Sequence, residues 1–174
     1  MAVAEHFRPA PQSLGPLHWS PVTAPKWEIQ DSADELASTQ TYTGKNYILI
    51  FYLGHGCLHC AEQLQAFGPR ADDFSDIGIE MMAISSDDRE GLKKSLNNFD
   101  GELPIRLASD HKLEIFKSFR AHDDFENQPL HGTFLIDTQG RIRWQDVSYE
   151  PFMEADFLLK ESKRLLQFSD KQEP

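Results

Sequence analysis

The only two cysteines of this 174-residue chain, Cys57 and Cys60, form a Cys-x-x-Cys motif directly after an apolar segment. A cysteine at the beginning of a helix lies near unpaired backbone N–H groups and the positive end of the helix dipole. Both stabilise a thiolate, so the cysteine becomes nucleophilic near neutral pH. The second cysteine stands one turn later and can close a disulfide with the first. The motif therefore predicts thiol–disulfide exchange, with Cys57 attacking a partner and Cys60 resolving the mixed disulfide.

The segments around the motif have the patterns needed to place it at a strand-to-helix junction. Residues 47–53 are an unbroken apolar run, which predicts a strand buried on both faces of a mostly parallel sheet. Gly54 and Gly56 break this strand, and residues 57–67 then follow a helical periodicity that ends before Pro69. A second apolar run at 77–84 completes a βαβ unit, so we expect parallel strands with a right-handed crossover.

The second half of the chain predicts further helices and a hairpin. Asp87, followed by Glu90 three residues later, is expected to cap one helix, and Asp110 another. Residues 133–147 predict an antiparallel hairpin, and Pro151 suits the first turn of a last helix. This order of elements predicts an α/β fold with a mixed central sheet flanked by helices.

Composition limits the class of protein. The net charge of −11 argues against nucleic acid or an acidic membrane surface as a partner. No segment is apolar enough to span a membrane, and no secretory signal is visible, so we expect a cytoplasmic protein, although a processed or excised form would look the same. Residues 23–168 are expected to form one domain. The proline-containing residues 1–22 predict an extended arm, and residues 169–174 a polar tail.

Several segments together resemble a known family. They are Pro25–Ile29, Gly44–Tyr52, Cys57–Cys60, the block from Ile79, and the segment from Thr133 to Ile142. They are similar to the peroxiredoxin-like (alkyl hydroperoxide reductase/thiol-specific antioxidant) branch of the thioredoxin superfamily, over roughly residues 25 to 168. The resemblance implies a thioredoxin-like fold and redox chemistry carried by cysteine, with no cofactor.

The family motif Pro-x-x-x-Thr-x-x-Cys can be laid on this chain residue by residue. Leu53 then stands at the proline, Cys57 at the threonine and Cys60 at the peroxidatic cysteine, while His131 stands at the family's arginine. Because the residues that orient a peroxide are replaced and the dithiol of thioredoxins is intact, we expect thiol–disulfide exchange as the main activity. The alternative is a peroxiredoxin in which Cys60 is peroxidatic and Cys57 resolving.

Two histidines join the cysteines as candidate site residues. His131 stands just before the strand expected at 133–137, and its ordinary pKa of about 6.5 suits proton transfer with a thiol. His59 lies inside the motif, and Cys-x-His-Cys resembles the motif of disulfide isomerases. We expect His59 to make the pair more oxidising than thioredoxin, whose potential is about −270 mV. Gln63, on the same helix, is expected to be a solvated surface residue.

A second alternative function is non-catalytic: binding of a metal ion, or redox sensing. Cys57, Cys60 and His131, with His55 or His59 nearby, offer the sulfur and imidazole ligands of a zinc or copper site, or of a redox sensor. For the enzymatic functions we expect protein disulfides or peroxides as substrates. A thioredoxin system or a small thiol is the expected reductant.

Overall fold

The computed structural model describes residues 21–97, 99 and 103–167. Most of the predicted arm, residues 1–20, and all of the predicted tail, 169–174, lie outside the described residues. Val22, the last residue of the predicted arm, already pairs with Ile142 in the central sheet. None of the helices in the described part of the chain is both long and apolar enough to cross a membrane.

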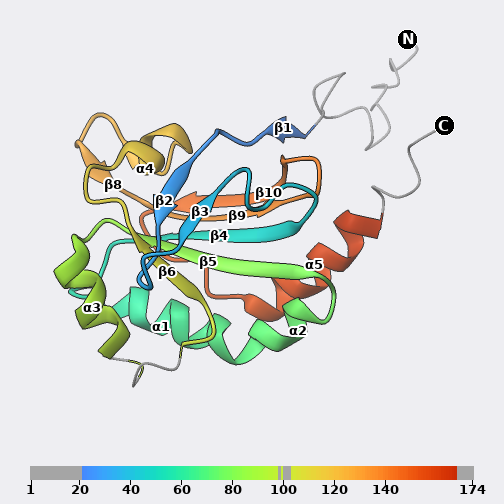
Figure 1. The fold of residues 1–174 in the computed structure, drawn as a ribbon, viewed down its shortest axis with the longest axis horizontal. Coiled ribbons are helices and arrows are strands. Elements are labelled where there is room, and N and C mark those ends of the chain that lie inside the picture. Colours follow the sequence, from blue (N-terminus) through green and yellow to red (C-terminus); the bar gives the residue numbers. More distant parts are fainter. Residues whose placement is uncertain (1–20, 98, 100–102, 168–174) are drawn as a thin grey trace, which may run out of the picture.

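A six-stranded mixed sheet forms the centre of the molecule, as predicted (Figure 1). Its strand order is β1-β10-β9-β4-β5-β6. Strands β4, β5 and β6 run parallel, whereas β9 is antiparallel to both β4 and β10. The strands are β1 (Val22–Thr23), β4 (Asn46–Tyr52), β5 (Ile79–Ser85), β6 (Arg106–Ser109), β9 (His131–Ile136) and β10 (Arg141–Ser148).

Two short ribbons accompany this sheet. One pairs β2 (Glu28–Gln30) with β3 (Leu36–Ser38), and the other pairs β7 (His122–Asp123) with β8 (Gln128–Pro129). The first ribbon joins the edge of the main sheet, because Asp31 bridges to Ala108.

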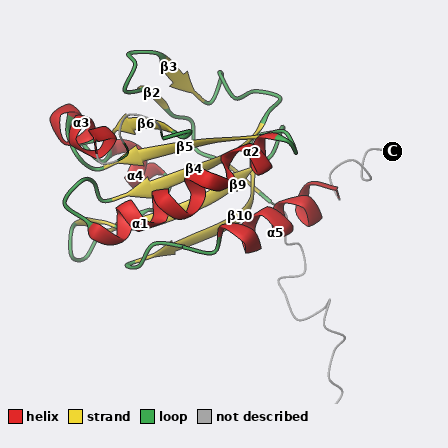
Figure 2. Ribbon diagram, turned by 90° about the horizontal axis from the view of Figure 1, so that it is seen from below, coloured by secondary structure: helices red, strands yellow, loops and turns green. Residues whose placement is uncertain are grey.

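Helices cover both faces of the sheet, and one face carries most of them (Figure 2). The side chains of β4 alternate between two apolar clusters, as strand geometry requires. Ile48 and Ile50 pack with helices α1, α2, α3 and α5, whereas Leu49 and Phe51 pack with α4 and the β2–β3 ribbon. The helices are α1 (Leu58–Phe67), the 3-10 turn η2 (Gly68–Arg70), α2 (Ala71–Ser75), α3 (Arg89–Asn97), α4 (Glu114–Ser118) and α5 (Ala155–Gln167).

The predicted order of elements around the motif is confirmed. Strand β4 is buried from Tyr47 to Tyr52, helix α1 follows it, and β5 pairs parallel to it. The expected hairpin is β9–β10, and Asp110 caps α4 by accepting the backbone N–H groups of Glu114, Ile115 and Phe116. The prediction that Pro151 opens the last helix is wrong: α5 begins at Ala155.

Candidate redox site

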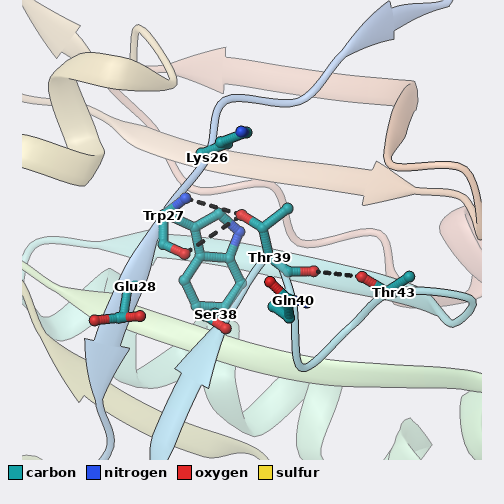
Figure 3. A pocket seen from close by; sticks show the side chains of 7 residues that line it. All are labelled: Lys26, Trp27, Glu28, Ser38, Thr39, Gln40 and Thr43. Atoms are coloured by element: carbon teal, nitrogen blue, oxygen red, sulfur yellow. Dashed lines mark hydrogen bonds between the residues drawn. The ribbon is translucent and has the colours of Figure 1, made fainter.

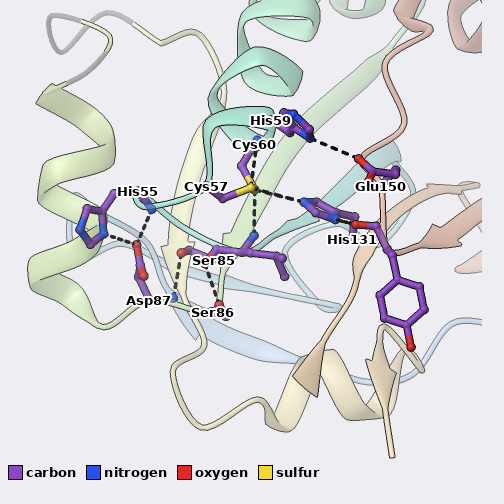
Figure 4. Close-up of a disulfide and its surroundings, with 11 residues drawn as sticks. His55, Cys57, His59, Cys60, Ser85, Ser86, Asp87, His131 and Glu150 are labelled. Atoms are coloured by element: carbon purple, nitrogen blue, oxygen red, sulfur yellow. Dashed lines mark hydrogen bonds and ion pairs between the residues drawn. A yellow bond between two sulfur atoms is a disulfide. The ribbon is translucent and has the colours of Figure 1, made fainter. Parts of the chain in front are cut away.

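The two cysteines lie at the junction between β4 and α1 and form a disulfide (Figure 4). Their Cα atoms are 5.3 Å apart. Cys57 is the N-cap residue of α1, with extended backbone angles, and Cys60 lies in the first turn of the helix. The expected placement of the dithiol at the N-terminus of a helix is therefore confirmed.

The two sulfur atoms differ in exposure. Cys60 is only 1% exposed and packs into the core from the buried face of α1, whereas Cys57 is half-buried. Each sulfur accepts one backbone N–H group: the Leu53 N–H at 3.3 Å from Cys60 Sγ, and the Cys60 N–H at 3.2 Å from Cys57 Sγ. Such N–H contacts stabilise negative charge on sulfur.

His131 stands beside the disulfide although it is 71 residues from Cys60 in sequence. It is the first residue of β9, which pairs with β4 and so brings it to the end of that strand. The His131 Nε2 atom lies 3.1 Å from Cys60 Sγ and 3.8 Å from Cys57 Sγ. The expected association of His131 with the two cysteines is present in the fold.

A hydrogen bond determines the tautomer of His131, and so whether the nitrogen that faces the sulfurs carries a proton or a lone pair. Nδ1 lies 2.8 Å from the carbonyl oxygen of Tyr149. A carbonyl oxygen only accepts, so Nδ1 carries the proton and donates it, and in the neutral ring Nε2 is unprotonated. The atom next to Cys60 Sγ is therefore a proton acceptor.

The environment of His131 keeps the ring neutral. The side chain is buried, and desolvation lowers its pKa below the ordinary value of 6.5. The hydrogen bond to Tyr149 and the charge of Glu150 act in the opposite direction but are smaller effects. A neutral imidazole with its lone pair toward sulfur can accept the proton of a thiol at pH 7.

His59 lies apart from the sulfur atoms. Its Nδ1 atom is 3.2 Å from Glu150 Oε2, and both side chains are exposed (Figure 4). The glutamate charge offsets a positive charge on the imidazole, which reduces its influence on the dithiol. The effect of His59 on the reduction potential stays a prediction.

Asp87 is a residue of the site that the sequence did not identify. Its Oδ2 atom accepts the backbone N–H of His55 at 2.7 Å and lies 2.9 Å from His55 Nδ1. Gly54 has a φ of +110°, and a Cβ added there would collide with the Asp87 carboxyl group. Asp87 therefore fixes the loop that precedes Cys57. The sequence could have indicated that Asp87 lies near Cys57. The two residues follow β4 and β5, which were predicted to be parallel, and the segments after parallel neighbouring strands meet at one edge of the sheet.

The prediction that Asp87 caps the following helix is wrong. Asp88 does so, since its Oδ1 atom accepts the Gly91 N–H at 2.9 Å.

The prediction that Gln63 is a surface residue is also wrong. Its side chain is completely buried, and its Nε2 atom donates to Thr133 Oγ1 at 3.2 Å and to the Phe152 carbonyl oxygen at 3.0 Å. These bonds tie α1 to β9 and to the segment before α5. Gln63 therefore helps to hold the helix that carries Cys60 against the strand that carries His131.

A surface hollow lies at the β2–β3 ribbon, away from the disulfide (Figure 3). Trp27 and Thr39 form part of its wall, and the Trp27 backbone N–H donates to Thr39 Oγ1 at 2.9 Å. Neither the cysteines nor His131 line it. This hollow is therefore separate from the Cys57–Cys60 disulfide at the β4–α1 junction.

Comparisons with known proteins find relatives that are named peroxiredoxins and peroxide reductases. The chain is 29% identical over 151 residues to the probable peroxiredoxin prdx-3 of Caenorhabditis elegans, covering 82% of this chain and 66% of that protein. It is 28% identical over 134 residues to the mitochondrial thioredoxin-dependent peroxide reductase of Drosophila melanogaster, covering 71% of this chain and 55% of that protein. The chain thus spans less than two thirds of the length of either relative.

Among solved structures, AhpC of Enterococcus faecalis superposes with a TM-score of 0.76, at 16% identity, over 87% of this chain and 94% of that chain. This likeness confirms the expected thioredoxin-like α/β fold. The sequence profile of the AhpC/TSA family matches residues 22–145, which include β4, the Cys-x-x-Cys motif and His131. The chain therefore belongs to the AhpC/TSA family.

Proposed function

We propose that this protein is a thiol-dependent peroxide reductase in which Cys60 reacts with the peroxide and Cys57 resolves the product. The observation that carries this proposal is the contact between the buried Cys60 Sγ and His131 Nε2, at 3.1 Å. Membership of the AhpC/TSA family supports it. The resemblance of the sequence to the family motif, which puts Cys60 at the peroxidatic cysteine, also supports it. This assignment reverses the order of preference drawn from the sequence.

The unequal exposure of the two sulfurs supports a division of roles. Cys60 is only 1% exposed, so a small oxidant such as hydrogen peroxide suits it better than a protein disulfide. Cys57 is half-buried at the surface, where the thiol of a reductant can attack its sulfur. Peroxide would then react at the buried sulfur of Cys60, and the reductant would open the resulting disulfide at the more exposed sulfur of Cys57.

The proposed cycle has three balanced steps. The Cys60 thiolate attacks one peroxide oxygen, giving a sulfenic acid, and the other oxygen leaves as an alcohol or water after protonation. The Cys57 thiol then condenses with the sulfenic acid, which forms the Cys57–Cys60 disulfide and releases water. Two thiols of a reductant restore the dithiol and become a disulfide themselves.

His131 takes the place of the family's arginine in this proposal. An arginine stabilises a thiolate by its charge and its N–H donors but cannot accept the proton of the thiol, because it does not lose its own proton. The unprotonated Nε2 of His131 can first remove the Cys60 proton, and the resulting imidazolium then stabilises the thiolate.

The reductant is proposed to be a thioredoxin-type protein or a small thiol. The Drosophila melanogaster relative is named a thioredoxin-dependent peroxide reductase. The exposure of Cys57 in this chain would allow attack by either kind of thiol.

The second candidate function is exchange with protein disulfides, with Cys57 as the attacking thiolate. Its exposure and its position as the N-cap residue of α1 favour this reaction. Both candidate functions end in the same Cys57–Cys60 disulfide, so single substitutions must distinguish them.

The test compares Cys57→Ser and Cys60→Ser in peroxide consumption and in reduction of insulin disulfides. For a peroxide reductase, Cys60→Ser abolishes the consumption of hydrogen peroxide. Cys57→Ser still consumes about one equivalent and accumulates a sulfenic acid at Cys60, which dimedone labelling and mass spectrometry detect.

The opposite pattern would support the second function. In that pattern, Cys57→Ser abolishes insulin reduction, Cys60→Ser traps mixed disulfides, and the wild-type protein does not consume peroxide. These results together would show that the assignment of Cys60 as the peroxide-reactive cysteine is wrong.

A further inference from the structure

We propose that the reduced protein binds one thiophilic d10 cation, Zn(II) or Cu(I), through Cys57 Sγ, Cys60 Sγ and His131 Nε2. The three donor atoms all lie within 4.8 Å of one another. This site does not depend on the proposed peroxide chemistry, because it requires only the free dithiol and the neutral histidine.

The donor atoms are already near the spacing that a metal requires. Zinc binds thiolate at about 2.3 Å and imidazole nitrogen at about 2.0 Å, which places sulfur and nitrogen ligands about 3.6 Å apart in a tetrahedron. The two sulfur–nitrogen distances here, 3.1 Å and 3.8 Å, lie on either side of that value. Only the two sulfurs must separate, and reduction of their bond permits this by rotation of the cysteine side chains.

Each donor is oriented by a further hydrogen bond. The Leu53 N–H reaches Cys60 Sγ and the Cys60 N–H reaches Cys57 Sγ, while His131 Nδ1–H donates to the Tyr149 carbonyl oxygen (Figure 4). Metal-binding histidines commonly donate their second ring N–H to such an acceptor, which fixes the tautomer and directs the lone pair at the metal.

The types of donor select the cation. Two thiolates and one imidazole are soft ligands, which favour Cu(I) and Zn(II) over Mg(II), Ca(II) or Mn(II). Cu(I) is satisfied by the three donors, whereas Zn(II) would add a water molecule at the exposed side of Cys57. Separate titrations distinguish the two ions.

Metal binding and disulfide formation exclude each other at this site. Oxidation of two metal-bound thiolates by one hydrogen peroxide and two protons gives the disulfide, two waters and the free cation. The bound metal would therefore be released on oxidation, and its presence would protect both sulfurs from oxidation and alkylation.

The experiment titrates the reduced full chain anaerobically with ZnCl2 against a zinc-binding dye, and with Cu(I) against bicinchoninate. The expected result is a 1:1 complex with at least one ion and a Kd below micromolar. The same protein with its disulfide closed should not compete for either ion. His131→Gln and Cys57→Ser should each weaken binding by more than about tenfold, whereas His111→Gln, which removes an exposed histidine that is not one of the three donors, should leave the affinity unchanged.

A second measurement uses the wild-type protein alone, so that a poorly folding variant cannot decide the matter. X-ray absorption of the bound metal should fit two sulfur ligands and one imidazole nitrogen. The proposal is overturned if neither ion binds more tightly than micromolar, if the oxidised protein binds equally well, or if the metal spectrum contains no imidazole. Failure to consume peroxide would contradict the proposed function and leave these measurements unaffected.

Discussion

At the scale of single residues, the reactivity of the site depends on which proton acceptor stands next to sulfur. His131 Nε2 faces Cys60 at 3.1 Å, and burial lowers the pKa of the ring below its ordinary value. The nearest histidine in sequence, His59, interacts instead with Glu150 at the surface. Proximity in sequence is therefore a poor guide to which imidazole acts on the thiol.

We expect His131→Gln, made in a Cys57→Ser background, to slow alkylation of Cys60 by iodoacetamide at pH 7 by about 10²-fold. Without the proton acceptor, hydroxide in the solvent must remove the proton of Cys60, and only the thiolate reacts with iodoacetamide. The rate for this variant should therefore keep rising beyond pH 8. With His131 present, the rate should level off at lower pH and decline only below about pH 6.5, since burial lowers the pKa at which the ring binds a proton.

The control for this prediction is His111→Gln in the same background, which should leave the pH profile unchanged. Mass spectrometry measures the fraction of alkylated Cys60 with time. Equal profiles for His131→Gln and its parent would show that His131 is not the proton acceptor.

At the scale of elements, the site depends on two parallel strands ending at the same edge of the sheet. The loop after β4 carries Cys57, and the segment after β5 carries Asp87, which binds His55 in that loop. A Cβ on Gly54 or on Gly91 would collide with the Asp87 side chain, so the carboxyl group is enclosed between this loop and the start of α3. Asp87 therefore positions the loop without touching sulfur.

We expect Asp87→Ala to slow closure of the Cys57–Cys60 disulfide by about tenfold, because the loop before Cys57 becomes mobile and the two sulfurs are less well oriented. Amide hydrogen exchange at His55 should become faster in the same variant. Closure is measured from the loss of free thiols after addition of oxidised glutathione.

Asp88→Ala is the matched control. It removes the hydrogen bond to Gly91 at the N-terminus of α3 and should lower the stability of the protein, like other N-cap losses. It touches no residue of the loop, so the rate of disulfide closure should stay at the wild-type value. Equal slowing by both variants would mean that general loss of stability, not loop position, controls closure.

At the scale of the whole molecule, the β2–β3 ribbon is joined to the edge strand β6 by an ion pair between the buried carboxylate of Asp31 and the half-buried Arg106. Asp31 is 3% exposed, and its Oδ2 atom accepts from Arg106 Nε at 2.9 Å and Nη2 at 2.7 Å. Its Oδ1 atom accepts the backbone N–H groups of Ala33 and Glu35. Burial alone would raise the pKa of Asp31, but these hydrogen bonds outweigh it and leave the pKa below the ordinary value.

We expect Asp31→Asn to lower the free energy of unfolding at pH 7 by about 2 kcal/mol, measured by urea denaturation. The sign of the pH dependence follows from the lowered pKa. The folded protein holds the carboxylate more strongly than the unfolded chain, so this stability is fully present above the unfolded pKa of about 3.9. It is lost as the pH falls through the lower folded pKa, and the difference between the two proteins should shrink there.

Lys45→Gln is the control for this prediction. Lys45 pairs with Glu80 at 2.8 Å, but about half of each side chain is exposed. Solvent screens such a pair, so its loss should change stability by less than about 1 kcal/mol. If Lys45→Gln lost as much unfolding free energy as Asp31→Asn, burial of the carboxylate would not explain the large effect expected for Asp31→Asn.

Sequence alone determined the features that depend on neighbouring residues. The apolar run of β4, the glycines after it and the helical periodicity from Cys57 place the dithiol at a strand-to-helix junction, because each of these signals acts within a few residues. The hairpin β9–β10 and the βαβ unit follow from the same kind of local pattern. The replaced positions of the family motif can likewise be found without coordinates.

Tertiary structure decided the contacts that distant groups make around the sulfurs, although the sequence had already identified His131 as a candidate site residue. His131 reaches Cys60 because β9 inserts beside β4, and Asp87 reaches the loop because β5 lies on the other side of β4. Local patterns do not specify this strand order, since pairing between distant strands depends on the packing of the whole sheet. The burial of Cys60, the exposure of Cys57 and the interior position of Gln63 arise in the same way, from helix α1 packing on that sheet.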